Sequence, residues 1–157
     1  MSERFSTAGM YLAYAAETTK DVRPTAGYIK IPEVKSIPSF NPAPETIDST
    51  TLEETEYRTY VKGLKDLGGA LEFGANLTDD LATDWATLIS TFDTTVLAGK
   101  KVWFVIAHPK LAEATFFTGD PSGIGINEAS VGSMAETTLY ITPTGSPVRA
   151  EKPTLAP

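Results

Sequence analysis

The stretch that decides the fold is 71-LEFGANLTDDLATDWATLISTF-92, followed shortly by 102-VWFVI-106. Its first residues alternate between apolar and polar or small side chains, the period of two that is typical of a half-buried strand. From Thr78 onward the apolar residues recur every three or four positions, which predicts a helix. The unbroken apolar run at 102–106 predicts a strand that is covered on both faces. The sequence therefore predicts a sheet with a helix lying on it.

The predicted helix covers about residues 79–92. Thr78 is a suitable N-cap, and Asp79 and Asp80 place negative charge at the positive end of the helix dipole. Helical spacing gathers one apolar stripe, formed by Leu77, Leu81, Trp85, Leu88, Ile89 and Phe92. We expect this stripe to pack on the sheet.

Further strands are predicted on both sides of this stretch. They lie at about 10–16, 28–31, 57–62, 114–118 and 137–142. Pro32 and Pro38 lack the amide hydrogen that a central ladder needs, so the strand at 28–31 is expected to be interrupted or at an edge. The predicted fold class is mostly β (α+β): a single domain over 1–157, an antiparallel β-sandwich or barrel-like subunit with one flanking helix.

Two segments are expected to stand apart from the core. Residues 38–56 are rich in Pro, Ser and Thr and predict an extended loop or hairpin arm. A loop this long in a compact domain is usually functional or disordered, and both interpretations stay open at this stage. Residues 148–157 are polar and proline-rich and predict a flexible C-terminal tail.

Composition excludes several function classes. The 157 residues contain no cysteine and one histidine, so thiolate and multi-histidine metal sites are excluded. The formal net charge of −7 argues against a surface that grips nucleic-acid phosphates. No apolar run approaches the length of a membrane span, and the polar N-terminus does not resemble a signal peptide. We therefore expect the chain to be made in the cytoplasm and to have no membrane partner.

Four patterns invite a chemical interpretation, and each has a simpler structural one. His108 follows a buried strand, but no spacing singles out an acid that would orient it as a general base. Asp79 and Asp80 fit a helix start better than an acid pair. The glycines of 119-GDPSGIGIN-127 lack a phosphate-loop lysine, and 53-EETE-56 lacks calcium-loop spacing. The sequence thus predicts no catalytic, metal or cofactor site and no enzyme.

Several short patterns, in this order along the chain, resemble the phage major tail tube proteins of long-tailed phages and related tail-like particles. The resemblance begins with 31-IPEVKSIPSF-40. It continues with an Ile-Asp-x-Thr pattern and a following leucine, then a glycine turn into a strand, then a closing strand that ends in "TPTG-P". The matching residues are Ile47, Asp48, Thr50, Leu52, Gly63, Leu64, Asp66, Gly68, Thr142, Pro143, Thr144, Gly145 and Pro147. The match covers most of the chain, from about residue 27 to 147.

The resemblance implies a structural subunit that closes into homohexameric rings, which stack into a hollow tube. It implies that DNA passes through the channel without specific binding. It also implies that the chain binds tail terminator, tail tip or baseplate, and tape-measure proteins. The implied location is the virion tail. The inter-ring loop would comprise Phe40, Pro42, Pro44, Ile47, Asp48, Thr50 and Leu52.

Charge and edge arguments agree with this implication. When sheets from neighbouring subunits join into a ring, the backbone groups at their open strand edges gain partners. An acidic channel wall repels the DNA phosphates, so the DNA slides through without binding. Glu72 is the predicted channel-facing acid. Two alternatives remain: a monomeric β-sandwich binding module of the carbohydrate-binding or adhesin type, and a small hydrolase that uses His108.

Overall fold

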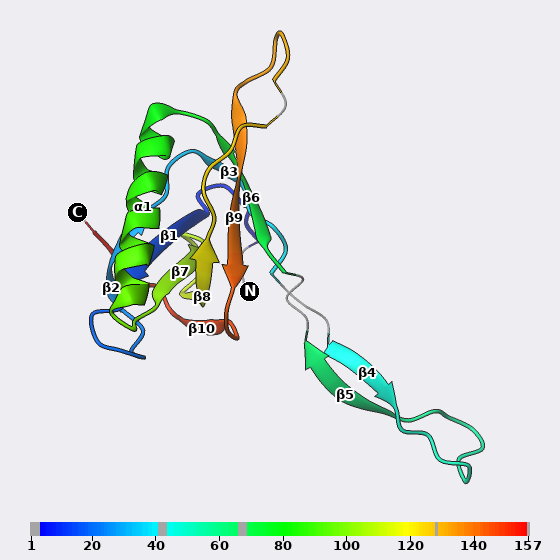
Figure 1. The fold of residues 1–157 in the computed structure, drawn as a ribbon. Helices are drawn as coiled ribbons and strands as arrows, with labels where there is room; N and C mark the ends of the chain where they lie inside the picture. Colours follow the sequence, from blue (N-terminus) through cyan, green and yellow to red (C-terminus); the bar gives the residue numbers. More distant parts are fainter. Residues whose placement is uncertain (1–3, 41–43, 66–68, 128, 157) are drawn as a thin grey trace. The chain divides into compact units, whose positions relative to one another are not determined.

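The computed structural model describes residues 4–40, 44–65, 69–127 and 129–156 (Figure 1). The chain divides into two compact units. One comprises Met1–Pro38 together with Ala70–Pro157, and we call it the sheet unit. The other is Ser39–Gly69, and we call it the arm.

The sheet unit holds one helix and, over its described residues, a nine-stranded sheet. In chain order these elements are β1 (Tyr11–Ala16), β2 (Ala26–Lys30), β3 (Val34–Ser36), β6 (Leu71–Asn76), α1 (Asp79–Leu97), β7 (Val102–Ala107), β8 (Glu113–Pro121), β9 (Glu136–Pro143), β10 (Val148–Glu151) and β11 (Thr154–Leu155). The strand order is β11-β2-β1-β7-β8-β9-β6-β3, with β10 paired to β8 beside this path. All neighbouring strands run antiparallel except β11 and β2.

The mostly β, α+β fold with one flanking helix is confirmed. The strands form one continuous curled sheet, which matches the barrel-like form of the prediction. Helix α1 covers one face of this sheet (Figure 1). No helix in the described part of the chain has the length and apolar character that a membrane crossing requires.

The core lies on both faces of the central strands. Cross-strand pairing places Tyr14 opposite Phe104, and Phe104 opposite Phe117. These three side chains are buried on one face, and the rings of Phe104 and Phe117 stack with centroids 5.6 Å apart. The alternate residues are buried on the opposite face, in a second cluster formed by Ala13, Ala15, Tyr28, Val105, Ala107, Ala114 and Phe116. The prediction that 102–106 is covered on both faces is consistent with this packing.

The predicted helix is confirmed, but it is longer than expected. The Thr78 hydroxyl accepts a hydrogen bond from the Leu81 amide at 3.2 Å, so the predicted N-cap is correct. The helix ends at Leu97 instead of residue 92. Thr95, a weak helix former, is buried and donates its hydroxyl to the Thr91 carbonyl at 2.6 Å. Packing of this side chain outweighs its low propensity, and Gly99 then takes a left-handed conformation (φ 75°).

Strand β1 buries four consecutive residues, from Leu12 to Ala15, so both of its faces are covered. One prediction needs correction. The segment 148–157 was expected to be a flexible tail, yet in the structure β10 pairs with β8, and β11 pairs with β2. The tail supplies the apolar residues Ala150 and Leu155 to the second core cluster, which explains why the sheet holds it.

The arm is a hairpin. Its strands are β4 (Pro44–Asp48) and β5 (Tyr60–Lys65), paired antiparallel with Ile47 opposite Val61. The arm is therefore longer than the predicted 38–56, because the strand expected at 57–62 belongs to the same hairpin.

Candidate assembly surfaces

The arm carries apolar side chains that its own unit does not cover. None of its described residues is buried, and Leu52, Leu64 and Tyr57 are exposed by 104%, 85% and 81%. Ile47 and Val61 share one face of the hairpin and are each about half exposed, at 53% and 54%. An exposed apolar strand pair of this kind is typical of an interaction surface.

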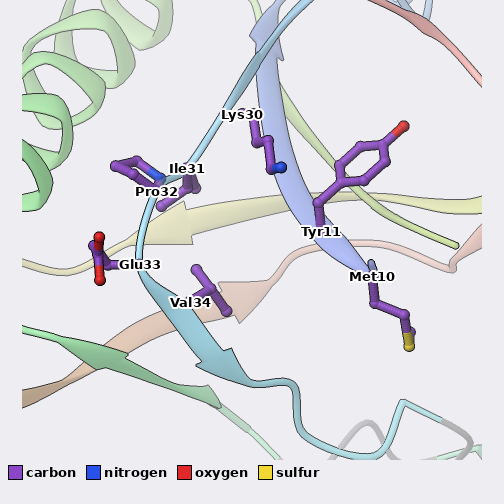
Figure 2. Close-up of a pocket in the computed structure, with 7 residues that line it drawn as sticks. All are labelled: Met10, Tyr11, Lys30, Ile31, Pro32, Glu33 and Val34. Carbon is purple, nitrogen blue, oxygen red and sulfur yellow. The ribbon is translucent and has the colours of Figure 1, made fainter. Parts of the chain in front are cut away.

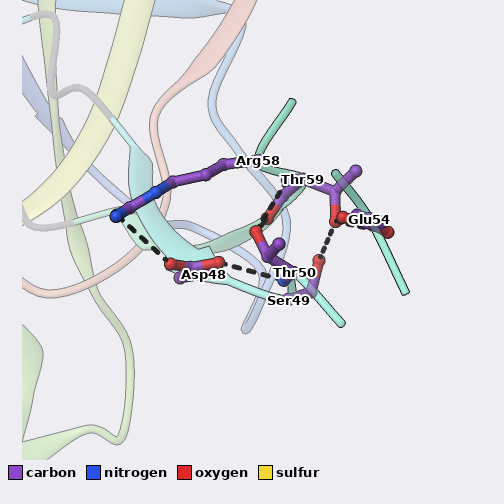
Figure 3. A network of polar contacts seen from close by, with 6 residues as sticks. All are labelled: Asp48, Ser49, Thr50, Glu54, Arg58 and Thr59. Atoms are coloured by element: carbon purple, nitrogen blue, oxygen red, sulfur yellow. Dashed lines mark hydrogen bonds and ion pairs between the residues drawn. The ribbon is translucent and has the colours of Figure 1, made fainter. Parts of the chain in front are cut away.

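Local polar contacts hold the distal part of the arm (Figure 3). The Thr50 amide donates to Asp48 Oδ1, and the Thr59 amide donates to Thr50 Oγ1, both at 2.9 Å. The Thr59 hydroxyl donates to Glu54 at 3.1 Å, and Arg58 lies 3.7 Å from Asp48. Hydrogen bonds from the side chain and the amide of Thr50 lower the pKa of Asp48 below its ordinary value. The hairpin therefore keeps its shape without a core.

Most of the predicted inter-ring loop residues lie on this arm, and they do not form one cluster. Ile47 is on one face, whereas Asp48 lies opposite Tyr60 on the other. Pro44 begins β4, Thr50 and Leu52 follow it, and Phe40 is half-buried near the start of the arm. Pro42 lies outside the described residues.

The predicted turn motifs also divide between the two units. In the arm, Gly63 lies in β5, where a Cβ would stand only 3.1 Å from the Glu45 carbonyl oxygen. Leu64 is exposed, while Asp66 and Gly68 lie outside the described residues. A glycine at position 63 therefore allows β4 and β5 to pair closely.

The "TPTG-P" pattern at 142–147 ends β9 and leads into β10. The amide of Thr144 donates to the Thr118 carbonyl, and their hydroxyls are bonded as well, both at 2.9 Å. A Cβ on Gly145 would lie 3.3 Å from the same Thr118 hydroxyl, so a larger residue would crowd it. Thr142 and Pro143 are the last residues of β9, and Pro147 directly precedes β10.

Glu72 lies on an exposed polar face of the sheet. It stands opposite Tyr140 across β6 and β9, between the buried Leu71 and Phe73. Asp120 is on the same face, because it pairs with Thr142, two residues from Tyr140 on β9. This face therefore presents two exposed carboxylates.

A groove of mixed polar and apolar lining runs beside strand β3, and the sequence analysis did not find it. One part has a volume of about 360 Å³ and the next about 640 Å³, and the two parts share Met10 and Val34. Figure 2 shows Met10 and Tyr11 on one side of the first part and residues 31–34 on the other. The groove joins residues far apart in the sequence that carry no common motif, so only the fold brings them together.

His108 is buried, and both of its ring nitrogens are engaged. Nδ1 accepts the Lys110 amide at 3.0 Å, which places the ring proton on Nε2. Nε2 then donates to the Ser6 carbonyl at 2.6 Å, and the Phe5 ring lies 4.4 Å from the imidazole. In this arrangement the ring fastens the N-terminal segment and has no free lone pair with which to act as a base.

Both tryptophans use their indole nitrogens inside the sheet unit. Trp85 is buried and donates to the Ser122 carbonyl at 2.7 Å. Trp103 is half-buried and donates at 2.8 Å to Glu17, a buried carboxylate that also accepts the Lys101 amide. Neither ring forms the open aromatic platform that a carbohydrate-binding surface would use.

Comparisons with known proteins give matches in structure alone. No protein-family model and no curated protein matches the sequence. A chain of the sixfold-symmetrised baseplate of the anti-feeding prophage is similar, with a TM-score of 0.64, 11% identity and coverage of 96% of this chain and 98% of that chain.

Two further solved structures are similar over nearly the whole chain. In the sheath–tube complex of the PVC extracellular contractile injection system, one chain matches with a TM-score of 0.58 and 11% identity. The match covers 94% of this chain and 92% of that chain. In the tail of a gene transfer agent particle with C6 symmetry, one chain matches with a TM-score of 0.57 and 17% identity. The match covers 90% of this chain and 95% of that chain. The chain has the fold of these tail-type proteins. The resemblance seen in the sequence is thus confirmed at the level of the fold.

Proposed function

We propose that this protein is a structural subunit of a phage-type tail tube, in which hexameric rings of the chain stack into a hollow conduit for DNA. The observation that carries the proposal is the full-length similarity to chains of a sheath–tube complex and of a tail with C6 symmetry. The similarity extends into the arm, because the arm is longer than the tenth of this chain that the lower coverage leaves unmatched.

Open edges and the arm support self-assembly. Strand β3 ends one side of the sheet and the two-residue β11 ends the other. Backbone groups at such edges need partners, and a ring of identical copies supplies them. The exposed apolar residues of the arm, such as Ile47 and Leu64, would be covered by another copy. We propose the arm as the contact between successive rings.

Charge supports passage of DNA without binding. A ring of six copies carries six times the net charge of −7. We propose that the face with Glu72 and Asp120 lines the channel, where its carboxylates repel the phosphates of the duplex. The proposed role of the protein requires no catalytic residue and no cofactor.

The proposed role also defines location and partners. The chain would be made in the host cytoplasm and assembled into the virion tail. Its partners would be a tail terminator, a tail tip or baseplate and a tape-measure protein. The protein would not be an enzyme, in agreement with the engaged ring of His108.

Negative-stain electron microscopy of the concentrated protein, with light scattering on a dilute sample, tests the proposal. We expect rings or hollow tubes with a bore wide enough for a DNA duplex. Monomers at every concentration, with and without an added tail-tip initiator, would instead favour a monomeric binding module. Replacement of His108 by Gln should leave assembly intact, whereas loss of a measurable hydrolase activity in that variant would revive the enzyme alternative.

A further inference from the structure

The groove beside β3 borders an unpaired strand edge. Within the described residues β3 pairs with β6 alone, as the last strand of the sheet. The second part of the groove is lined by residues 34–38, which include all of β3, and by residues 7–10 across from them. The groove therefore offers free backbone donors and acceptors along one wall, the arrangement used when an extended segment adds to a sheet.

The walls of the groove combine apolar side chains with two lysines. Met10, Val34 and Ile37 contribute apolar surface. Lys30 and Lys35 line it as well, Lys35 being paired with Glu136, and Glu33 is the single carboxylate among the lining residues. An extended segment that has an apolar side chain and flanking acids fits these walls.

Strand β4 of the arm has this composition. Its sequence, 44-PETID-48, carries Glu45 and Asp48 and no basic residue, with the half-exposed Ile47 between them. It pairs on one side with β5, and over the described residues its other edge is open. Strand β5 carries Lys62, so it would bring like charge to Lys30 of the groove.

We propose that the groove beside β3 receives strand β4 from a second copy of this chain, with Ile47 against the apolar walls. This inference rests on the proposed self-assembly and names the surface that the arm contacts. Lys30 meets Glu45, which favours β4 over β5. The backbone groups along the open edges of β3 and β4 then form hydrogen bonds with each other.

Cross-linking of mixed single-cysteine variants tests the contact, because the chain has no cysteine of its own. One variant carries Ile47→Cys and the other Met10→Cys, and a short bismaleimide is added after they are mixed at assembly concentration. A heterodimer cross-linked through both cysteines is by construction intermolecular. The control pair is Ile47→Cys with Val96→Cys, since Val96 is 50% exposed on the helix and lies outside the groove.

We expect at least about tenfold more cross-linked dimer from the Ile47–Met10 pair than from the control pair, because docking raises the effective concentration of the two thiols. Equal yields from the two pairs, in a sample that forms tubes, would overturn the groove contact and leave the tube standing. Specific cross-links without rings or tubes would support the contact and contradict the tube.

A charge exchange gives an independent test. Glu45→Lys and Lys30→Glu each place like charges in the proposed contact, so each should lower the assembled fraction measured by light scattering. A chain with both changes restores opposite charges and should recover assembly. If the double variant assembles no better than either single variant, while far-ultraviolet circular dichroism shows all three folded, the contact is wrong.

Discussion

In the sheet unit the large side chains of Phe73, Phe104 and Leu88 are fully buried, whereas in the arm Ile47, Val61 and Leu64 are at least half exposed. The helix and the C-terminal strands of the sheet unit help to cover its core residues, although other apolar side chains of this unit, such as Leu97 and Ile126, stay exposed. The arm is held by backbone pairing and by short polar contacts around Thr50 and Thr59. The comparison supports the proposal that the sheet unit supplies stability and that the arm supplies association.

The sharpest way to break this comparison is to remove one large apolar side chain from each unit. Phe104→Ala should lower the free energy of unfolding by about 3–5 kcal/mol, since it leaves a cavity in a packed core. Leu64→Ala in the arm should change it by less than about 0.5 kcal/mol, because Leu64 is exposed. Urea unfolding followed by circular dichroism measures both. Similar losses in the two variants would show that the arm belongs to the core.

A glycine pair sharpens the comparison within the sheet unit. A Cβ on Gly119 would lie 2.6 Å from the Ile141 side chain, so Gly119→Ala should cost about 1–3 kcal/mol of unfolding free energy through overpacking. Gly123 has no neighbouring atom within 4 Å of the position of its Cβ, so Gly123→Ala is the control, with an expected change below about 0.5 kcal/mol. Thermal unfolding distinguishes them, and an unchanged Gly119→Ala would refute the tight packing of β8 on β9.

The helix cap gives a smaller effect. Thr78→Ala removes the hydroxyl that accepts the Leu81 amide and should cost about 1 kcal/mol of unfolding free energy. Thr83→Ala, at an exposed position inside the helix, should stabilise by a few tenths of a kcal/mol because alanine is the better helix former. We expect urea unfolding to show a lower free energy of unfolding for Thr78→Ala and a higher one for Thr83→Ala. A lower value in both variants would argue that the Thr83 side chain has a stabilising contact of its own.

In the arm, the smallest expected effect is a change in one titration. Thr50→Ala removes the side-chain hydrogen bond that is the largest cause of the lowered pKa of Asp48, so that pKa should rise toward its ordinary value. Any stabilisation from the lowered pKa is present at neutral pH and is lost as the pH falls through the folded-state pKa. NMR titration of the Asp48 carboxyl carbon measures the change, with Thr46→Ala as the control. An unchanged pKa would mean that the network of Figure 3 does not form in solution.

The sequence predicted the elements whose pattern is local. The alternation of β6 and the Thr78 cap depend on near neighbours, and both appear in the structure. The end of the helix and the pairing of 148–155 depend on tertiary contacts, such as burial of Thr95 and packing of Leu155, which no local pattern records. For the same reason the groove was missed, since it requires Met10 and Val34 to meet through the sheet.

The most direct measurement compares the full chain with a variant in which residues 39–69 are replaced by a short Gly/Ser linker. Ser36 and Gly74 are paired across β3 and β6, so a short linker can close the sheet unit. The variant should show the unfolding free energy and circular dichroism of a folded sheet unit, and electron microscopy should find no stacked tubes. A variant that fails to fold, or that still builds tubes like the full chain, would contradict the division of roles between the sheet unit and the arm.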